Sequence, residues 1–254
     1  MTAISATESR RFRLRVARAV ATSFLEVGSV VEILRDDDPD VLIVRAPADD
    51  PAIAATLAQI SGYVTLTADM LMYWQWNASS LDEPRPGANQ TVPTTDAAQI
   101  AFLVGAVFEG YTNHYAANPL LAAQDALDGY VEWAQTLVNA GATCVVLHAG
   151  SGEPTGFGLI DWVEPVPDVR LAGILPHARG KGAYRDLIAH LMRTVRDHGG
   201  SALRISTQAH NTGVMRAWAE AGWRPISTQV TFHMIRSELL PQRVAEVSRP
   251  TLPI

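Results

Sequence analysis

A short glycine-containing loop is the segment whose residue types are best suited to bind a ligand. Arg179-Gly180-Lys181-Gly182 follows an apolar run that ends in Leu175-Pro176, and it leads into a helical pattern. Main-chain N–H groups converge at the start of a helix, where the helix dipole is positive. Glycines let the main chain approach an anion closely, and Arg179 and Lys181 add positive charge. The loop therefore predicts a site for a phosphate or diphosphate group.

The glycine spacing separates this loop from two common nucleotide-binding motifs. The segment 175–183 lacks the spacing of a Walker loop, and it also lacks the extra glycines of a dinucleotide fingerprint. The sequence thus argues against a nucleotide triphosphatase and against an NAD enzyme.

The loop and its surroundings resemble the GNAT superfamily of acyltransferases. The family signature is Gln/Arg-x-x-Gly-x-Gly/Ala after a strand, and residues 174–183 read Ile-Leu-Pro-His-Ala-Arg-Gly-Lys-Gly-Ala, with His177 at the Gln/Arg position. The resemblance covers roughly 92–235 and includes the segment 206–211 ahead of Ala221-Gly222-Trp223. It implies that acetyl-CoA, or another acyl-CoA, is bound by a set of residues around the loop: Ile174, Leu175, His177, Arg179, Gly180, Lys181, Gly182, Ala183 and Asn211.

The same resemblance implies a catalytic arrangement. Two strands at 171–175 and 203–207 would splay apart and hold the pantetheine arm of the cofactor between them. The N–H group of Ile174, or that of Leu175, would then stabilise the oxyanion, a contribution of ~3 kcal/mol for one such donor. Much of the remaining catalysis would come from holding amine and thioester together.

The proton donor of the family is replaced in this sequence. A tyrosine seven residues after an asparagine usually protonates the leaving thiolate, and the count from Asn211 reaches Trp218. An indole N–H does not ionise usefully near neutral pH. Tyr184 and His210 are the nearest candidates for this role, although packing or helix capping would also explain either residue.

The segment 108–119 is dense in aromatic and amide side chains that suit a small polar acceptor. His114 is also a candidate general base, because the unperturbed pKa of histidine is ~6.5. A polar turn with two tyrosines in the core is the alternative. We expect His233 to be ordinary strand packing, and Glu109 and Asp161 are weaker candidate bases. The predicted acceptor-binding residues are Tyr111, Asn113, His114, Tyr115 and Asn118.

Hydrophobic periodicity predicts a mixed α/β fold with a largely antiparallel sheet, splayed at the cofactor site, in two domains. Residues 1–88 would form a smaller α/β domain similar to part of the GNAT fold, and 89–254 the catalytic domain. The basic run at 10–15 is expected on a solvated helix face. Residues 79–93 have the composition of a linker. In the first domain we predict strands at 41–44 and 63–76 and a helix at 51–60. In the second, two helices follow Asp96, which is the expected N-cap, and three antiparallel strands lie within 143–175. A helix at 182–196, a strand at 202–207, a helix at 211–220 and a strand pair at 223–235 complete the prediction.

Composition limits the function classes further. The formal net charge is −6, which does not favour nucleic acid as a partner. No apolar stretch approaches the roughly 20 residues of a membrane span, so we expect a cytoplasmic protein without a membrane partner. The single cysteine, Cys144, excludes a multi-cysteine metal site, and no metal is predicted. The oligomeric state is left open, with a homodimer as one option.

These features together predict an N-acyltransferase that acylates the primary amine of a small polar acceptor. The layout of 41–73 is similar to the dTDP-fucosamine acetyltransferase type of the family, which implies a nucleotide-linked amino sugar or an aminated natural product as acceptor. Two alternatives stand beside this reading. Trp218 at the acid position would also suit an acyl-CoA-binding module without activity, and the acceptor would then be irrelevant. A protein N-acetyltransferase is the other.

Overall fold

The computed structural model describes residues 3–78, 87–163 and 165–240 and contains a single mixed sheet of nine strands in the order β1-β2-β9-β3-β8-β7-β6-β5-β4. The elements are α1 (Ala6–Phe12), β1 (Val16–Val20), η1 (Phe24–Glu26), α2 (Val27–Asp36), β2 (Val41–Pro47), α3 (Pro51–Leu57), β3 (Tyr63–Asn77), β4 (Gln90–Thr94), α4 (Ala97–Phe108), η2 (His114–Ala117), α5 (Ala123–Asn139), β5 (Thr143–His148), β6 (Pro154–Asp161), β7 (Asp168–Ile174), η3 (Pro176–Ala178), α6 (Ala183–Asp197), β8 (Ala202–Gln208), α7 (Thr212–Glu220), β9 (Arg224–Arg236) and η4 (Ser237–Leu239).

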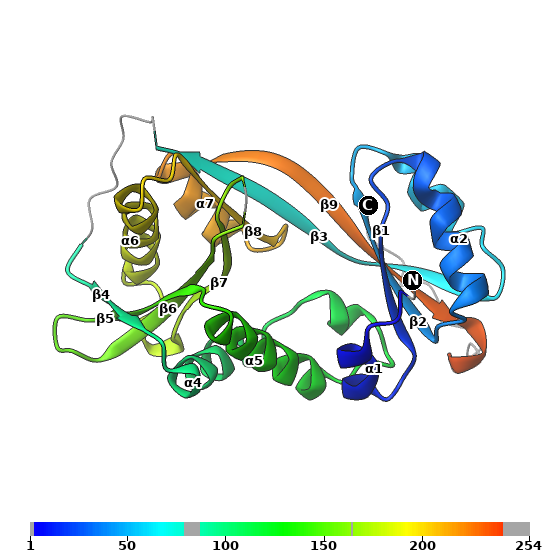
Figure 1. Cartoon of the computed structure of the whole chain (residues 1–254), viewed down its shortest axis with the longest axis horizontal. Coiled ribbons are helices and arrows are strands. Elements are labelled where there is room, and N and C mark those ends of the chain that lie inside the picture. Colours follow the sequence, from blue (N-terminus) through cyan, green and yellow to red (C-terminus); the bar gives the residue numbers. More distant parts are fainter. Residues whose placement is uncertain (1–2, 79–86, 164, 241–254) are drawn as a thin grey trace, which may run out of the picture.

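Six consecutive strands of the sheet, from β1 at its edge to β7, form a near-symmetric arrangement. In the N-terminal half β1 pairs with β2 in parallel, and in the C-terminal half β7 pairs with β8 in parallel. Each pair is followed by a helix and a long strand, but the long strands exchange halves: β3 pairs with β8, and β9 pairs with β2. Figure 1 shows β3 and β9 running side by side between the two ends of the molecule. The two halves therefore share one continuous sheet.

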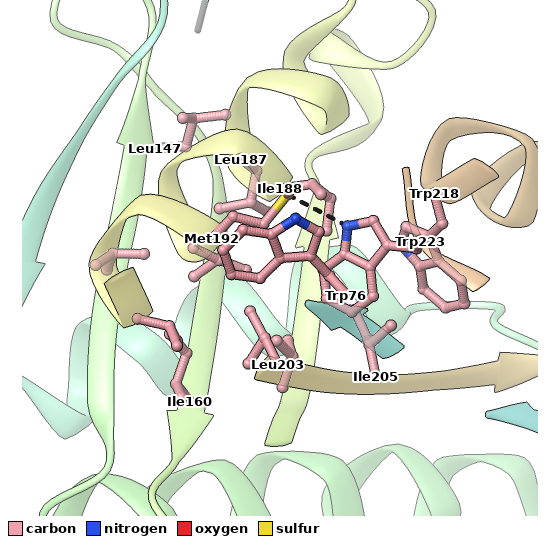
Figure 2. Packing of buried hydrophobic residues seen from close by; sticks show 14 of the residues in the cluster. Trp76, Leu147, Ile160, Leu187, Ile188, Met192, Leu203, Ile205, Trp218 and Trp223 are labelled. Atoms are coloured by element: carbon pink, nitrogen blue, oxygen red, sulfur yellow. Dashed lines mark hydrogen bonds between the residues drawn. The ribbon is translucent and has the colours of Figure 1, made fainter. Parts of the chain in front are cut away.

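Helices cover both faces of the sheet in the C-terminal half. On one face, α6 packs over β5 to β8 with the indoles of Trp76, Trp218 and Trp223, and Figure 2 shows the hydrogen bond from Trp223 Nε1 to Met192 Sδ (3.3 Å) in this cluster. On the other face, α4 and α5 pack over β5, β6 and β7. Cys144 is buried there, and burial raises the pKa of its thiol to about 11.

Helices also cover both faces of the sheet in the N-terminal half, and one of them, α5, packs against both halves. Helices α2 and α3 pack on β1, β2 and β9, whereas α1, η2 and the start of α5 cover the opposite face. Helix α5 thus extends from the C-terminal half toward α1, as seen along the lower edge of Figure 1. This placement brings the segment 108–126 against strands of the N-terminal half.

Much of the predicted order of elements is confirmed. Asp96 caps α4 by accepting hydrogen bonds from Ala98 N and Gln99 N at 2.9 and 3.0 Å. Strands β5, β6 and β7 form the expected antiparallel meander. The strands predicted at 41–44, 63–76 and 202–207 and the helices predicted at 51–60, 182–196 and 211–220 are present with small shifts at their ends.

Three predictions are wrong. The basic run at 10–15 begins in α1 but leaves it at Arg13 (φ 56°), and β1 begins directly after the run, at Val16, in place of a longer helix. Residues 90–93 lie in β4, the edge strand beside β5, although the first part of the predicted linker, 79–86, lies outside the described residues. The C-terminal strand pair is one strand, β9, because it pairs with β3 and β2 on its two sides rather than with itself.

The division into 1–88 and 89–254 remains a prediction about independent folding. Within the described residues, no helix is both long and apolar enough to span a bilayer.

Candidate active site

Strands β7 and β8 separate at their C-terminal ends. They are paired only at Asp168↔Arg204 and Val169↔Ile205, although β7 continues to Ile174 and β8 to Gln208. Beyond Val169, β7 is paired only with β6 on its other side, and β8 only with β3. The main-chain groups that line this gap can therefore hydrogen-bond an extended ligand, as an added strand would.

Hydrogen bonding at the end of β7 distinguishes the two candidate oxyanion donors. Leu175 N donates to Thr155 O at 2.8 Å, so this N–H is used within the sheet. Successive residues of a strand direct their main-chain groups to opposite neighbours, which turns the groups of Ile174 toward the gap. Of the two alternatives, Ile174 is the donor that the geometry favours.

The loop after β7 has the backbone conformation that its glycines require. Gly180 and Gly182 have φ of 75° and 81°, in the left-handed region where a side chain causes strain, and a Cβ at either position would meet nothing within 4 Å. Gly182 is the N-cap of α6 and makes no side-chain cap. The first N–H groups of α6 thus have no acceptor within the helix. The loop fits a diphosphate group, since a compact anion would satisfy these donors.

The basic side chains of the loop differ in use. Arg179 folds back and donates to Ile174 O at 3.1 Å and to Val107 O at 3.0 Å, which ties the loop to β7 and α4. Lys181 is exposed, and His177 lies 3.5 Å from Glu153. Lys181 is therefore the better placed of the two predicted cations to neutralise an anion.

The tryptophan at the family's acid position contacts one of the two proposed substitutes. Trp218 Nε1 donates to the hydroxyl of Tyr184 at 3.0 Å, so this phenol keeps its own proton available for another acceptor. Burial raises the pKa of Tyr184. Both residues line the same cavity, whereas His210 is exposed and lies beside Tyr111 with ring centroids 6.5 Å apart.

A cavity of about 520 Å³ connects the gap with the N-terminal half. Tyr184, Trp218 and Asn211 line it at the gap, and Asn211 Nδ2 donates to Thr207 Oγ1 at 3.1 Å. The aromatic wall comes from α4, α5 and the segment between them: Phe108, Tyr111, Tyr115, Tyr130 and Trp133. The cofactor gap and the predicted acceptor segment thus open on one space.

Comparison with known proteins agrees with this geometry. Residues 109–223 match the model of the acetyltransferase (GNAT) family. This segment is thus similar in sequence to the acetyltransferase domain of the GNAT family. No curated protein sequence matches it significantly.

Solved structures share the fold over most of the chain. A GCN5-related N-acetyltransferase from Sphaerobacter thermophilus is 16% identical with a TM-score of 0.58, over 84% of this chain and 69% of that one. One from Kribbella flavida is 18% identical with a TM-score of 0.56, over 87% and 81%. A tandem GNAT protein from the clavulanic acid biosynthesis pathway, solved without AcCoA, is 17% identical with a TM-score of 0.54, over 86% and 71%. The mixed α/β sheet is therefore the GNAT fold, as predicted.

The residues of the predicted acceptor segment are divided between two places: some line the cavity, and others hold the loop itself. Tyr111 and His114 line the cavity, and Tyr111 donates to Gln208 Oε1. The side chains of Asn113 and Asn118 are buried and do not line it: Asn113 Oδ1 caps η2 by accepting from Tyr115 N, and Asn118 Oδ1 accepts from Leu120 N. These two amides hold the loop in shape in place of the acceptor contact that we predicted.

The hydroxyl of Tyr115 is engaged by an ion pair of the N-terminal half. It donates to Glu8 Oε1 at 2.6 Å and accepts from Arg18 Nη2 at 2.9 Å, while Arg18 also binds Glu8 at 2.7 Å. Burial raises the pKa of Tyr115 to about 12. The pKa of Glu8 is lowered, because the hydrogen bonds and charge of Arg18 outweigh the effect of burial. The hydroxyl of Tyr115, a residue that lines the cavity, is therefore already paired within the protein.

His114 and His233 form a buried pair. His114 Nδ1 and His233 Nε2 are 2.8 Å apart, and His233 Nδ1 lies 3.2 Å from Asn118 Nδ2. Burial lowers the pKa of His114 well below its usual value and that of His233 to about 4, and the charge of Arg18 contributes to both shifts. Both rings are neutral at pH 7. His233, predicted as ordinary strand packing, is instead the polar partner of His114.

Sequence reasoning missed the part of the site that comes from the N-terminal half. Arg18 on β1, Arg45 on β2 and Asp69 on β3 all line the cavity. Each is a charged residue among β-forming or apolar neighbours in the sequence, which is the signal that singles them out. Nothing in the local pattern shows, however, that these strands join the acyl-transfer sheet.

Proposed function

We propose that this protein transfers an acetyl group, or another short acyl group, from acyl-CoA to the primary amine of a small polar acceptor. The observation that carries the proposal is the coincidence of two features at the end of β7: the gap between β7 and β8, and the glycine loop at the start of α6. A diphosphate bound at the loop and an extended arm in the gap are the two halves of one coenzyme A molecule. The GNAT match over 109–223 supports the same reaction class.

The residues that would hold acyl-CoA follow from this geometry. The main-chain N–H groups of Gly180, Gly182 and Ala183 would bind the diphosphate together with Lys181, and those facing the gap from 171–174 would bind the pantetheine arm. Acetyl-CoA would supply a thioester, whose carbonyl carbon is activated toward an amine.

Two groups of the chain are placed to assist the transfer. The N–H of Ile174 can donate to an oxygen that gains negative charge, a contribution of about 3 kcal/mol when the donor is preorganised. Tyr184 keeps its phenolic proton beside the gap, because Trp218 donates to the oxygen and leaves the proton for transfer to a leaving thiolate. The phenol thus comes from α6 rather than from α7.

The cavity supports a small acceptor with a ring and hydroxyl groups, such as a nucleotide-linked amino sugar or an aminated natural product. Phe108 and Tyr130 are stacked with centroids 4.6 Å apart and 7° between their planes, and Tyr111 lies edge-on to both. Aromatic walls of this kind pack against sugar rings. A cavity that lies between two halves of one chain and has an aromatic wall favours such an acceptor over a protein substrate.

Acetyl-CoA and a panel of amino sugars, mixed with the purified protein, should release free thiol in proportion to the enzyme. Calorimetry with CoA alone should show one binding site per chain. Tight CoA binding without turnover on any amine would contradict the transferase reading and favour the second candidate, an acyl-CoA-binding module. Trp218 is the observation behind that candidate, because it replaces the usual acid.

A further inference from the structure

Three residues form a row across neighbouring strands, and the two outer ones line the cavity. Arg45 of β2 is directly opposite Thr231 of β9, and Thr231 is opposite Asp69 of β3. Opposed residues in antiparallel strands lie on the same face of a sheet. Two strand spacings place the Cα atoms of Arg45 and Asp69 about 10 Å apart. Both residues line the cavity, so a cation and an anion face the same space without touching.

The side-chain polar atoms of this row lack partners. Both carboxylate oxygens of Asp69 and Oγ1 of Thr231 are buried without a hydrogen bond. The guanidinium of Arg45 has no hydrogen-bond or ion-pair partner among the described residues, although its main-chain oxygen accepts from Ala21 N. An uncompensated buried carboxylate is costly, and such groups persist where a ligand supplies the missing partner. Since the acceptor of the proposed reaction is an amine, its ammonium form is the natural partner of Asp69.

The hydrogen bonds around His233 determine which histidine nitrogens carry protons at the end of the cavity near Arg45. Leu120 N–H donates to Asn118 Oδ1, so the amide NH₂ of Asn118 donates to His233 Nδ1. His233 must then carry its proton on Nε2 and donate it to His114 Nδ1. A proton on His114 Nδ1 would leave His233 with none.

His114 therefore carries its proton on Nε2, the ring nitrogen left to face the cavity that it lines. It presents an N–H donor there rather than a lone pair, which disfavours the role of general base predicted from the sequence. The positive charges of Arg18 and Arg45 act on this ring and disfavour its protonation. His114 and Arg45 thus form a donor group suited to an anionic oxygen.

We propose that the acceptor carries an anionic group, a phosphate or a carboxylate, in addition to its amine. Arg45 and His114 Nε2–H bind the anionic oxygens, and the Asp69 carboxylate binds the ammonium group on the side nearer the acyl gap. This inference rests on the proposed function and narrows its acceptor. The acceptor is selected by its two charges and by the distance between them.

Matched pairs of acceptors test the proposal. Glucosamine is compared with glucosamine 6-phosphate, and an amino acid methyl ester with the free amino acid, by the rate of thiol release. We expect kcat/KM to be at least tenfold higher for the anionic member of one pair, and the pair that shows it identifies phosphate or carboxylate. Equal kcat/KM within both pairs would overturn the proposal.

Charge-removing variants assign the preference to residues. Arg45→Met should lower kcat/KM at least tenfold more for the anionic acceptor than for its neutral partner, whereas Arg35→Met, a change on the exposed face of α2, should alter neither. Asp69→Asn should lower kcat/KM for both members of a pair and raise the melting temperature of the ligand-free protein. A lower melting temperature in Asp69→Asn would mean that the carboxylate is structural and would contradict its role in binding.

The proton relay is tested separately from turnover. In Asn118→Asp, a carboxylate accepts from both Leu120 and His233, so the relay reverses and His114 Nε2 becomes an acceptor. Imidazole ¹⁵N spectra should show the exchange of protonated nitrogens, and calorimetry with glucosamine 6-phosphate in saturating CoA should show weaker binding than in wild type. Saturating CoA keeps the glycine loop occupied, so failure here is distinct from failure to bind CoA. Unchanged binding after a reversed relay would overturn the role of His114.

Discussion

The sheet contains two parallel strand pairs that have the same topology but differ in how far they are hydrogen-bonded to each other. Strands β1 and β2 are paired at five positions, from Val16↔Val41 to Val20↔Arg45, whereas β7 and β8 are paired at two. Both pairs are joined through a helix, α2 or α6, and both lead to a long strand that crosses to the other half (Figure 1). One pair is closed by its own hydrogen bonds, and the other leaves main-chain groups for a ligand.

The loops that precede α2 and α6 also differ in whether the protein itself satisfies their main-chain N–H groups. In the N-terminal half the carboxylate of Glu26 accepts the N–H of Thr22 at 2.7 Å, so a side chain of the protein occupies the turn. In the C-terminal half Gly182 leaves the start of α6 without a side-chain cap. A repeated topology therefore need not repeat a function. The closed half contributes strands and charges to the cavity, and in the proposed function the open half would bind the cofactor.

The strongest test of this comparison uses two glycines with nearly equal backbone angles. Gly182 (φ 81°) lies in the open loop and Gly62 (φ 82°) precedes β3, and a Cβ at either meets nothing within 4 Å. Valine at either position should cost ~1–2 kcal/mol of stability, because both are left-handed. Only Gly182→Val should weaken CoA binding, by at least about 30-fold in Kd by calorimetry. An equal loss of affinity in Gly62→Val would remove the assignment of the loop.

The next test compares the effect on turnover of removing one tyrosine hydroxyl from each half. Tyr184→Phe removes the proton donor beside the gap, and kcat should fall ~100-fold with little change in KM for acetyl-CoA. Trp218→Phe loses the hydrogen bond to Tyr184 and part of a buried ring, so a few-fold decrease in kcat and a lower melting temperature are expected. Tyr63→Phe is the control in the other half, where the hydroxyl donates to Pro39 O. If Tyr184→Phe turns over at the wild-type rate, another group or water supplies the proton.

How much of this fold could be predicted depended on whether the signal was local. Elements with clear periodicity and caps, such as α4 after Asp96, were placed from the sequence alone. Strand β4 was missed because Pro93 and its polar neighbours are typical of a linker, although proline is tolerated at the edge position that β4 holds. The exchange of β3 and β9 was not predictable, since pairing across more than a hundred residues leaves no local pattern.

The same contrast applies to the site. The glycine loop was identified because its geometry depends on residue types within one turn, and Gly180 and Gly182 have the expected backbone angles. The acceptor residues depended on which way each side chain points. Asn113 and Asn118 turned inward to cap and orient the loop, and Asp69 and Arg45 came from strands assigned to another domain.

A third test concerns the histidine pair, which joins the open half to the closed half. The pKa of His233 is lowered to about 4 in the folded state, chiefly by burial and then by Arg18, against an upward effect of Glu8. Between pH 6.5 and 4 the unfolded chain binds more protons at this residue, so the free energy of unfolding decreases as pH falls. From pH 7 to 5 the decrease from His233 should be about 2 kcal/mol in urea unfolding.

His233→Gln should remove that part of the pH dependence, and His198→Gln, at an exposed position, should leave it unchanged. The same slope in wild type and His233→Gln would mean that His233 is already accessible to protons in the folded state. In that case the buried contact between the two halves would be weaker than the hydrogen bonds indicate.

The smallest effect is expected at Glu26, and it separates two explanations for the closed half. The hydrogen bonds from Thr22 lower the pKa of Glu26, so its contribution to stability is present above the unfolded pKa and is lost as pH falls through the folded pKa. Glu26→Gln should therefore slightly shift only the acid limb of the unfolding curve, compared with Glu32→Gln in α2, the helix that Glu26 precedes. Calorimetry should still find one CoA per chain, because the pairing of β1 with β2 keeps this half closed. Binding of a second CoA molecule per chain by the Glu26→Gln variant would show that the carboxylate, and not the strand pairing, distinguishes the two halves.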